Sequence, residues 1–394
     1  MPFETHASWT GHGLIDASVT VTGYRESSLD SPDLAQHSLA ALWAEFGVIG
    51  VRDAGSSVTA NVRQHDYCRA AQYRGATKYR RATHVCGTGL VLVEGTPLGD
   101  GDVVLTEPAL DAALGIASAI EPSAPSLIFK PESTAWLEHW ADRARRKHSG
   151  VKISARGAAA VHSAVTAQLH LVDSFPWLAI SAPSQRTPLE VLQAWSRADE
   201  RAIDQRVAEF VASNIAVTTE FLALRRSVFI KEALTAAHLD RVEPILPHAK
   251  HVADMRRAGG YLSGRRSLAK FAGIEQPKSQ QLAEAEEGWQ RMMSAATRAV
   301  KLGLKVLPAS RSPLLTSCPG YSLLEELALL VHAGIPAATV FELAGSVAAD
   351  VLALPFSREP VFTAAHLPDE PAQILRLRAT DASAFSWDSG TATR

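Results

Sequence analysis

The chain has 394 residues, of which 46% are hydrophobic and 20% charged, and its formal net charge is −2. This length fits one large domain or two smaller ones, with enough apolar residues for a large core. The nearly neutral charge predicts no binding to nucleic acid and no binding to an anionic membrane surface.

The three cysteines, Cys68, Cys86 and Cys318, are too few and too far apart for a disulfide framework or a zinc-binding motif. The first residues show neither the basic region nor the apolar run of a signal peptide. The most apolar stretch, 323–354, is interrupted by charged residues and a proline, so we expect no membrane span. These features predict a cytoplasmic protein.

Short β-branched runs alternate with amphipathic helical runs along the chain. This repeated order predicts a parallel sheet, and eight strand candidates favour a closed (β/α)₈ barrel. The strand candidates are 13–18, 47–52, 83–86, 150–154, 177–181, 190–193, 215–219 and 304–308. The helix candidates are 34–46, 60–75, 131–147, 158–171, 199–213, 323–333 and 337–353.

Two segments interrupt this alternation. Residues 88–122 are rich in Gly, Pro and Asp and predict a long loop or insertion, and residues 222–302 predict a mostly helical insertion. We expect the barrel to occupy residues 1–355 and a C-terminal extension to follow at 356–394, with a strand candidate at 373–378.

Four segments occur in an order that is typical of one enzyme group. They are Gly13-Leu14-Ile15-Asp16, the strand end 50–55, Val151-Lys152-Ile153, and the helical region 321–354. Together they resemble the amidohydrolase superfamily, especially its imidazolonepropionase and prolidase-like branch. The resemblance implies a barrel whose strand ends bind a catalytic metal, beside a flanking β-sandwich that we expect to be reduced or absent here.

The chain departs from the family at the metal ligands. Ser18 and Thr20 stand where the family has a His-x-His pair, and Ser310 or Arg311 replaces the aspartate after the last strand. On the fifth and sixth strands the family has single histidines, and the matching places here are Ser181 and Ala194.

Only Lys152 remains of the family's metal-binding set, where it would be the carboxylated lysine. Catalytic zinc needs about three protein ligands, which hydroxyl groups and a guanidinium cannot supply. We therefore expect no bound metal and no other cofactor.

The catalytic candidates lie at expected strand ends. Lys152 is a candidate base or Schiff-base former, Asp16 and Glu220 are candidate carboxylate partners, and His84 is a candidate acid or base. Each has a structural alternative: Asp16 in a turn, His84 with Cys86 in the core, and Lys152 paired with Asp16 or Glu220. The candidate substrate-binding residues are Ser18, Thr20, Ser181, Thr218, Ser310 and Arg311.

A buried pair of Arg52 with Asp53 is expected at the second strand end. Arg311 suits a carboxylate or phosphate, with a structural salt bridge as its alternative. The small-molecule partner is therefore expected to be anionic. The apolar helices at 323–354 also predict a homodimer.

Three functions fit these residues. The first is metal-independent acid/base catalysis on a small anionic metabolite, by cyclisation, isomerisation, elimination or hydrolysis, in bacterial secondary metabolism. The second is a non-catalytic binding or scaffold protein. The third is a conventional metal-dependent amidohydrolase with rearranged ligands, drawn from His6, His12, His84 or His170.

Overall fold

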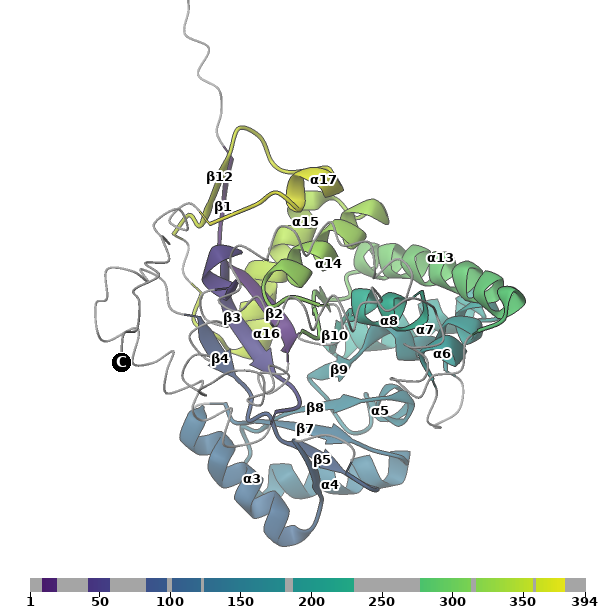
Figure 1. The fold of residues 1–394 in the computed structure, drawn as a ribbon. Helices are drawn as coiled ribbons and strands as arrows, with labels where there is room; N and C mark the ends of the chain where they lie inside the picture. The colour runs from purple at the N-terminus through teal and green to yellow at the C-terminus, as the bar shows by residue number, and fades with distance from the viewer. Residues whose placement is uncertain are drawn as a thin grey trace, which may run out of the picture.

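Parallel strands and surrounding helices form a mixed α/β fold in a computed structural model (Figure 1). The structure describes residues 9–19, 42–56, 83–97, 101–121, 124–180, 187–229, 277–312, 317–356 and 359–379. No helix within these ranges is both long and apolar enough to cross a membrane.

Two parallel sheets carry the fold. One has the strand order β11-β10-β9-β8-β7-β5-β6 and the other has the order β2-β3-β4. The bounds are β2 (Leu14–Val19), β3 (Val48–Asp53), β4 (His84–Cys86), β5 (Val91–Val93), β6 (Asp102–Val104), β7 (Ser126–Lys130), β8 (Lys152–Arg156), β9 (Leu171–Asp173), β10 (Ala216–Thr218) and β11 (Val306–Leu307). The expected parallel sheet is thus confirmed.

Backbone hydrogen bonds join the two sheets at one side. Ala17 N donates to Pro308 O over 3.1 Å, and Arg311 N donates to Ser18 O over 2.9 Å, so β2 lies beside the segment that follows β11. Among the described residues, β4 and β7 do not pair with each other, since the two edges of β7 are paired with β5 and β8. The closed eight-stranded barrel therefore stays a prediction.

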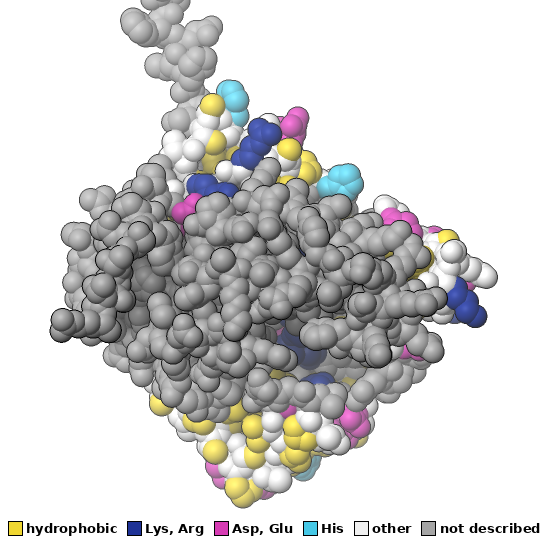
Figure 2. All heavy atoms as spheres, viewed as in Figure 1, with side chains coloured by type: hydrophobic (Ala, Val, Ile, Leu, Met, Phe, Trp, Pro, Cys, Tyr) yellow, Lys and Arg dark blue, Asp and Glu magenta, His cyan; other side chains and the backbone are white. Residues whose placement is uncertain are grey.

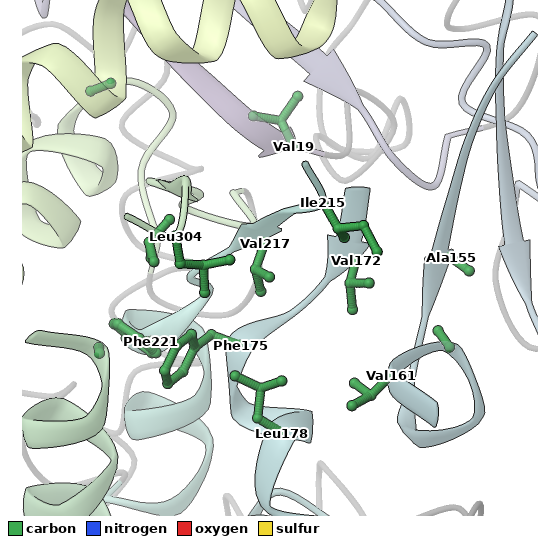
Figure 3. Close-up of a cluster of buried hydrophobic side chains, with 14 of the residues drawn as sticks. Val19, Ala155, Val161, Val172, Phe175, Leu178, Ile215, Val217, Phe221 and Leu304 are labelled. Carbon is green, nitrogen blue, oxygen red and sulfur yellow. The ribbon is translucent and has the colours of Figure 1, made fainter. Parts of the chain in front are cut away.

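The strands have two chemically different faces because successive side chains point to opposite sides of a sheet. Val172, Val217 and Ala155 pack into the main hydrophobic core with the helices, and Figure 3 shows them in one cluster with Phe175 and Phe221. The opposite, inner face has a smaller apolar cluster made of Ile15, Ala17, Cys86, Leu171, Ala216, Leu307 and Ala309, with Ala348, Ala349 and Leu352 packed on it.

Two expected strands are helical. The segment 190–193 lies in α6 (Pro188–Ser196), where Thr187 and Glu190 form a capping box and Pro188 occupies the first turn. The segment 177–181 overlaps η3, a 3₁₀ helix at Phe175–Ala179. Both predictions were wrong because short apolar runs do not distinguish a strand from a buried helical turn.

Four strands of the two parallel sheets were missed. β7 and β9 were not assigned as strands, and β5 and β6 lie in the segment 88–122 that was expected to be a loop. That segment also contains α3 (Glu107–Ile120), which Thr106 caps through its hydroxyl. Because β5, β6 and β7 precede β8, the strand that begins at Lys152 is the seventh parallel strand along the chain and not the fourth, as expected.

The other helices largely confirm the predictions. They are α4 (Thr134–Lys147), α5 (Ala158–Ser163), α7 (Glu200–Ala212), α8 (Phe221–Val228), α13 (Ser279–Lys301), α14 (Tyr321–His332), α15 (Ala337–Glu342), the π-helical η5 (Leu343–Val347) and α16 (Ala348–Leu352). α5 is shorter than the expected 158–171, and the helix candidate 60–75 lies outside the described residues.

The two ends of the described chain meet in a small antiparallel sheet. β1 (Trp9–Gly11) pairs with β12 (Phe362–Ala364), and α17 (Pro371–Ile374) follows. α17 replaces the first part of the strand expected at 373–378, so that prediction was wrong. The domain boundary at 355 and the reduced flanking sandwich stay predictions.

Two helical glycines give a paired stability prediction. A Cβ at Gly288 of α13 would lie 1.8 Å from Leu192 O, whereas a Cβ at Gly115 of α3 meets nothing within 4 Å. We expect Gly288→Ala to lower the free energy of unfolding by about 1–3 kcal/mol through overpacking. The control, Gly115→Ala, should raise it by about 0.5–1 kcal/mol. Urea unfolding measures both, and an unchanged midpoint for Gly288→Ala would contradict the close α6–α13 packing.

Candidate functional site

Charged side chains from distant segments gather at the carboxyl ends of the parallel strands. Arg156 ends β8, Glu220 follows β10, and Arg311 follows β11. Their side chains are 17%, 12% and 22% exposed, respectively, and we call these three residues the rim. Figure 2 shows Lys or Arg side chains in a recess of the viewed face, in the region where Figure 1 places β8 and β9. The carboxyl ends of parallel strands are where α/β folds place their sites.

A buried ion pair lies next to the rim. The two terminal nitrogens of Arg52 donate to the two carboxylate oxygens of Asp173 over 2.9 and 3.0 Å, and both side chains are at most 1% exposed. Arg52 also donates to Ser154 Oγ over 2.6 Å and to Ala17 O over 3.2 Å. The Thr218 hydroxyl donates to Asp173 over 3.3 Å. This pair connects β2, β3, β8, β9 and β10.

Electrostatics keeps this pair ionised. Burial alone would raise the pKa of Asp173, but Arg52 and Arg156 more than offset it and lower the pKa below its usual value. The partner of Arg52 is thus Asp173, and the expected partner Asp53 instead accepts from Ser56 Oγ over 2.6 Å. That expectation was wrong.

The rim contains incompletely bonded charges. Arg311 and Glu220 approach to 3.6 Å between a guanidinium nitrogen and Oε1, which is an ion pair without a hydrogen bond. Neither of these two buried atoms has a hydrogen-bond partner among the described residues. Both residues have left-handed backbones, with φ of 56° for Glu220 and 54° for Arg311. Such conformations cost about 1–3 kcal/mol each and persist only where the surroundings enforce them.

Arg156 adds a second positive charge to the rim. One terminal nitrogen donates to Ala54 O over 2.9 Å and lies 3.9 Å from Asp173, while its buried Nε has no partner in the described parts of the chain. Burial, followed by the nearby Arg311, lowers the pKa of Arg156 to about 10. Two guanidinium groups and one carboxylate leave the rim with a net positive charge.

Asp16 and Ser310 lie on the outer face of the strands, since they alternate with the inner-face residues Ala17 and Ala309. Asp16 accepts from Ser310 N over 2.9 Å and from the Ser310 hydroxyl. Burial raises the pKa of Asp16 to about 7. The structure therefore brings these two candidates together as a connection between β2 and the segment after β11, and the negative charge of Glu220 in the rim adds to the rise in the pKa of Asp16.

Lys152 and His84 lie at the opposite ends of their strands. Each is the first residue of its strand, β8 and β4 respectively. Lys152 Nζ donates to Val351 O over 2.7 Å, so its expected pairing with Asp16 or Glu220 is not formed. Burial lowers the pKa of Lys152. The strand expected at 150–154 is confirmed as β8, with Lys152 at its amino end and Arg156 at its carboxyl end.

The remaining candidates have mixed outcomes. Thr218 lies where expected and bonds to Asp173, whereas Thr20 and Ser181 lie outside the described residues. Ser18 is buried at an irregularity in the β2–β3 register, and its hydroxyl has no partner there. Ala194 lies on α6.

Sequence reasoning missed Arg156 and Asp173. Arg156 could have been found by alternation, because Lys152, Ser154 and Arg156 share one face of β8. Asp173 ends β9, which had been read as the end of a helix and a loop, so no pattern pointed to it.

The residues at the strand ends do not fit the metal that the family resemblance implies. Within the described ranges, no three His, Cys, Asp or Glu side chains are placed to hold a metal ion. Asp173 is bonded to Arg52, and a cation at the rim would face Arg156 and Arg311. A divalent metal needs anionic or imidazole ligands, and guanidinium groups repel it.

No protein-family model and no curated protein matches the sequence. Solved structures do match, and they are enzymes of the amidohydrolase superfamily. Bottromycin amidohydrolase has a TM-score of 0.62 at 13% identity, over 94% of this chain and 75% of its own. A putative prolidase from Bifidobacterium longum has a TM-score of 0.53 at 17% identity, over 94% and 79%. An Xaa-Pro dipeptidase with bound methionine has a TM-score of 0.55 at 11% identity, over 93% and 83%.

At these identities the likeness shows the fold. It confirms that the fold resembles that of amidohydrolases. The imidazolonepropionase and prolidase-like branch and the loss of the metal ligands stay predictions.

Asp16 gives a prediction about pH and stability. Its pKa rises on folding from the usual 3.8 to about 7, so the folded state binds the proton more tightly. The resulting stabilisation is complete below about pH 4 and is lost as the pH rises to about 7, at about 1.4 kcal/mol per pKa unit. We expect Asp16→Asn to remove this loss, as measured by urea unfolding at about pH 5 and about pH 8. If the free energy of unfolding depends on pH equally in the wild type and in Asp16→Asn, the raised pKa of Asp16 is contradicted.

Proposed function

We propose that this chain is an amidohydrolase-fold enzyme that hydrolyses an amide bond in a small molecule bearing a carboxylate, without a metal ion. In this proposal Arg156 and Arg311 bind the substrate and Glu220 is the general base and acid. The Glu220–Arg311 pair carries the proposal, since both members have buried atoms without hydrogen-bond partners.

The charge of the rim supports an anionic substrate. Arg156 Nε and one terminal nitrogen of Arg311 have no acceptor among the residues that the structure describes, and leaving a buried donor without an acceptor costs free energy. A carboxylate accepts two parallel bonds from a guanidinium group and would restore charge balance. The Xaa-Pro dipeptidase with methionine in its active site is a fold neighbour that holds such a group.

Glu220 has the position that acid/base catalysis needs. Its side chain is 12% exposed, and its Oε1 is free of hydrogen bonds within the described structure. In the proposed reaction Glu220 takes a proton from water while the water oxygen attacks the amide carbon. The guanidinium groups stabilise the negative charge that develops on the carbonyl oxygen. Glu220 then donates the proton to the leaving nitrogen as the C–N bond breaks.

The same guanidinium groups support metal independence. A metal in this fold would supply positive charge at the strand ends, and Arg156 and Arg311 supply it instead. We also propose that the two parallel sheets close into a barrel below the rim, with β7 paired to β5, the strand that follows β4, and with β2 beside the segment after β11.

A binding protein without turnover is the second candidate. It is favoured because two carboxyl groups near the strand ends bond to other residues of the chain and are not available to a substrate: Asp16 is bonded to Ser310 and Asp173 to Arg52. Only Glu220 remains for chemistry among these three acids.

Turnover distinguishes the two candidates. A panel of N-acetyl amino acids is incubated with the protein, and release of the free amino acid is measured by mass spectrometry. We expect Glu220→Gln to lower kcat by roughly 10²–10⁴, the usual contribution of a general base. The control is Glu287→Gln, at an exposed position of α13.

Elemental analysis of the same protein tests metal independence. A stoichiometric metal whose removal by EDTA abolishes turnover would refute it. Binding without turnover of any panel member would favour the second candidate.

The arginines are tested by binding. We expect Arg156→Gln and Arg311→Gln each to weaken the binding of N-acetylmethionine to the Glu220→Gln protein about tenfold, because each removes a charge-assisted hydrogen bond. Isothermal titration measures the dissociation constants. N-acetylmethioninamide lacks the carboxylate and should bind equally to all variants. Arg201→Gln, exposed on α7, is the control. Unchanged affinity for the acid would rule out the arginines as its binding site.

A further inference from the structure

A second buried glutamate lies behind the rim. Glu326 of α14 is 0% exposed, and its two oxygens accept from Phe221 N and Leu222 N, each over 2.8 Å. The Thr219 hydroxyl also donates to this carboxylate. Burial raises the pKa of Glu326 to about 7, and the three hydrogen bonds oppose that rise.

These contacts fall on both sides of Glu220 in the chain. Thr219 precedes Glu220 and Phe221 follows it, so Glu326 holds the two residues that set the backbone of Glu220. Thr219 Oγ1 also accepts from Ala309 N over 3.0 Å, two residues before Arg311. One carboxylate therefore connects the backbones of both members of the Glu220–Arg311 pair.

The arrangement leaves the Glu220 side chain uninvolved in capping α8. Glu220 immediately precedes α8, at the position where a Ser, Thr, Asp or Asn side chain usually accepts from the first N–H groups of a helix. Glu220 makes no such bond, and Glu326 accepts from the N–H groups of Phe221 and Leu222 instead. Its carboxylate can then face Arg311 while its backbone keeps a φ of 56°.

We propose that Glu326, acting through Thr219 and the first turn of α8, is the positioning residue that holds Glu220 against Arg311. This inference rests on the proposed function for its catalytic meaning. The geometric claim concerns only the Glu220–Arg311 pair and can be tested without a substrate.

The neighbouring Glu325 provides a matched control. It lies on the same helix and also pairs with α8, through Arg226 over 2.6 Å, yet it has no contact with the residues that flank Glu220. If Glu326 only fastens α14 to α8, Glu325→Gln and Glu326→Gln should behave alike.

The experiment compares Glu326→Gln, Glu325→Gln, Thr219→Val and Thr219→Ser. The first readout is the rate at which phenylglyoxal modifies Arg311, followed by peptide mass spectrometry. We expect Glu326→Gln and Thr219→Val to raise this rate several-fold, because Arg311 loses its carboxylate neighbour. Thr219→Ser keeps the hydroxyl and, like Glu325→Gln, should match the wild type.

The second readout is turnover of whichever N-acetyl amino acid the wild type hydrolyses. Glu326→Gln should lower kcat by roughly ten- to a hundredfold with little change in KM, less than the loss of the base itself. Wild-type Arg311 modification rates in both Glu326→Gln and Thr219→Val would overturn the positioning role. So would an equal effect of Glu325→Gln.

These outcomes separate the two proposals. If the wild type hydrolyses nothing, the proposed function fails, and the Arg311 modification rates still decide the role of Glu326. If Glu326→Gln does not fold, the two Thr219 variants give the decision, because Thr219→Val keeps the side-chain volume without the hydroxyl and Thr219→Ser keeps the hydroxyl without the methyl group.

Discussion

The buried ion pair between Arg52 and Asp173 is the interaction on which the candidate site depends. It joins side chains from β3 and β9, and its hydrogen bonds extend to Ser154, Thr218 and the backbone of Ala17. Removing one member of such a pair leaves an uncompensated buried charge, at about 3–5 kcal/mol. The pair also neutralises Asp173, so the positive charge of Arg156 and Arg311 is opposed only by Glu220 among the rim residues. This local charge balance is what the proposed binding of an anionic substrate rests on.

The buried carboxyl groups near the strand ends divide by how completely they are hydrogen-bonded. Asp16 connects β2 to the segment after β11, and Glu326 connects α14 to the start of α8. Burial raises the pKa of both to about 7, yet each is held by hydrogen bonds to backbone N–H groups. Glu220, by contrast, has few bonds and some exposure. Well-bonded acids thus hold the frame, and a poorly bonded acid is available for chemistry.

The part of the fold that could be predicted has strong local signals. The helices α4, α7 and α14 have amphipathic spacing, and β2, β3 and β10 are apolar runs followed by polar strand ends. The errors fall on short segments. Residues 190–193 satisfy a strand pattern, although Thr187, Pro188 and Glu190 signal a helix start. β9 has only three residues, and missing it concealed Asp173. The strand expected at 150–154 stopped two residues short of Arg156, which ends β8.

By itself, the sequence determined the alternation of strands and helices, the parallel sheet, and the presence of Glu220 and Arg311 directly after two strands. These features depend on local periodicity and on neighbouring residues, so they can be read along the chain. Only the tertiary structure decided that Arg52 pairs with a residue 121 positions away, that Asp16 and Ser310 face outward, and that Glu326 controls the neighbours of Glu220. Such choices depend on sheet register and helix packing, because a shift of one residue moves a side chain to the opposite face.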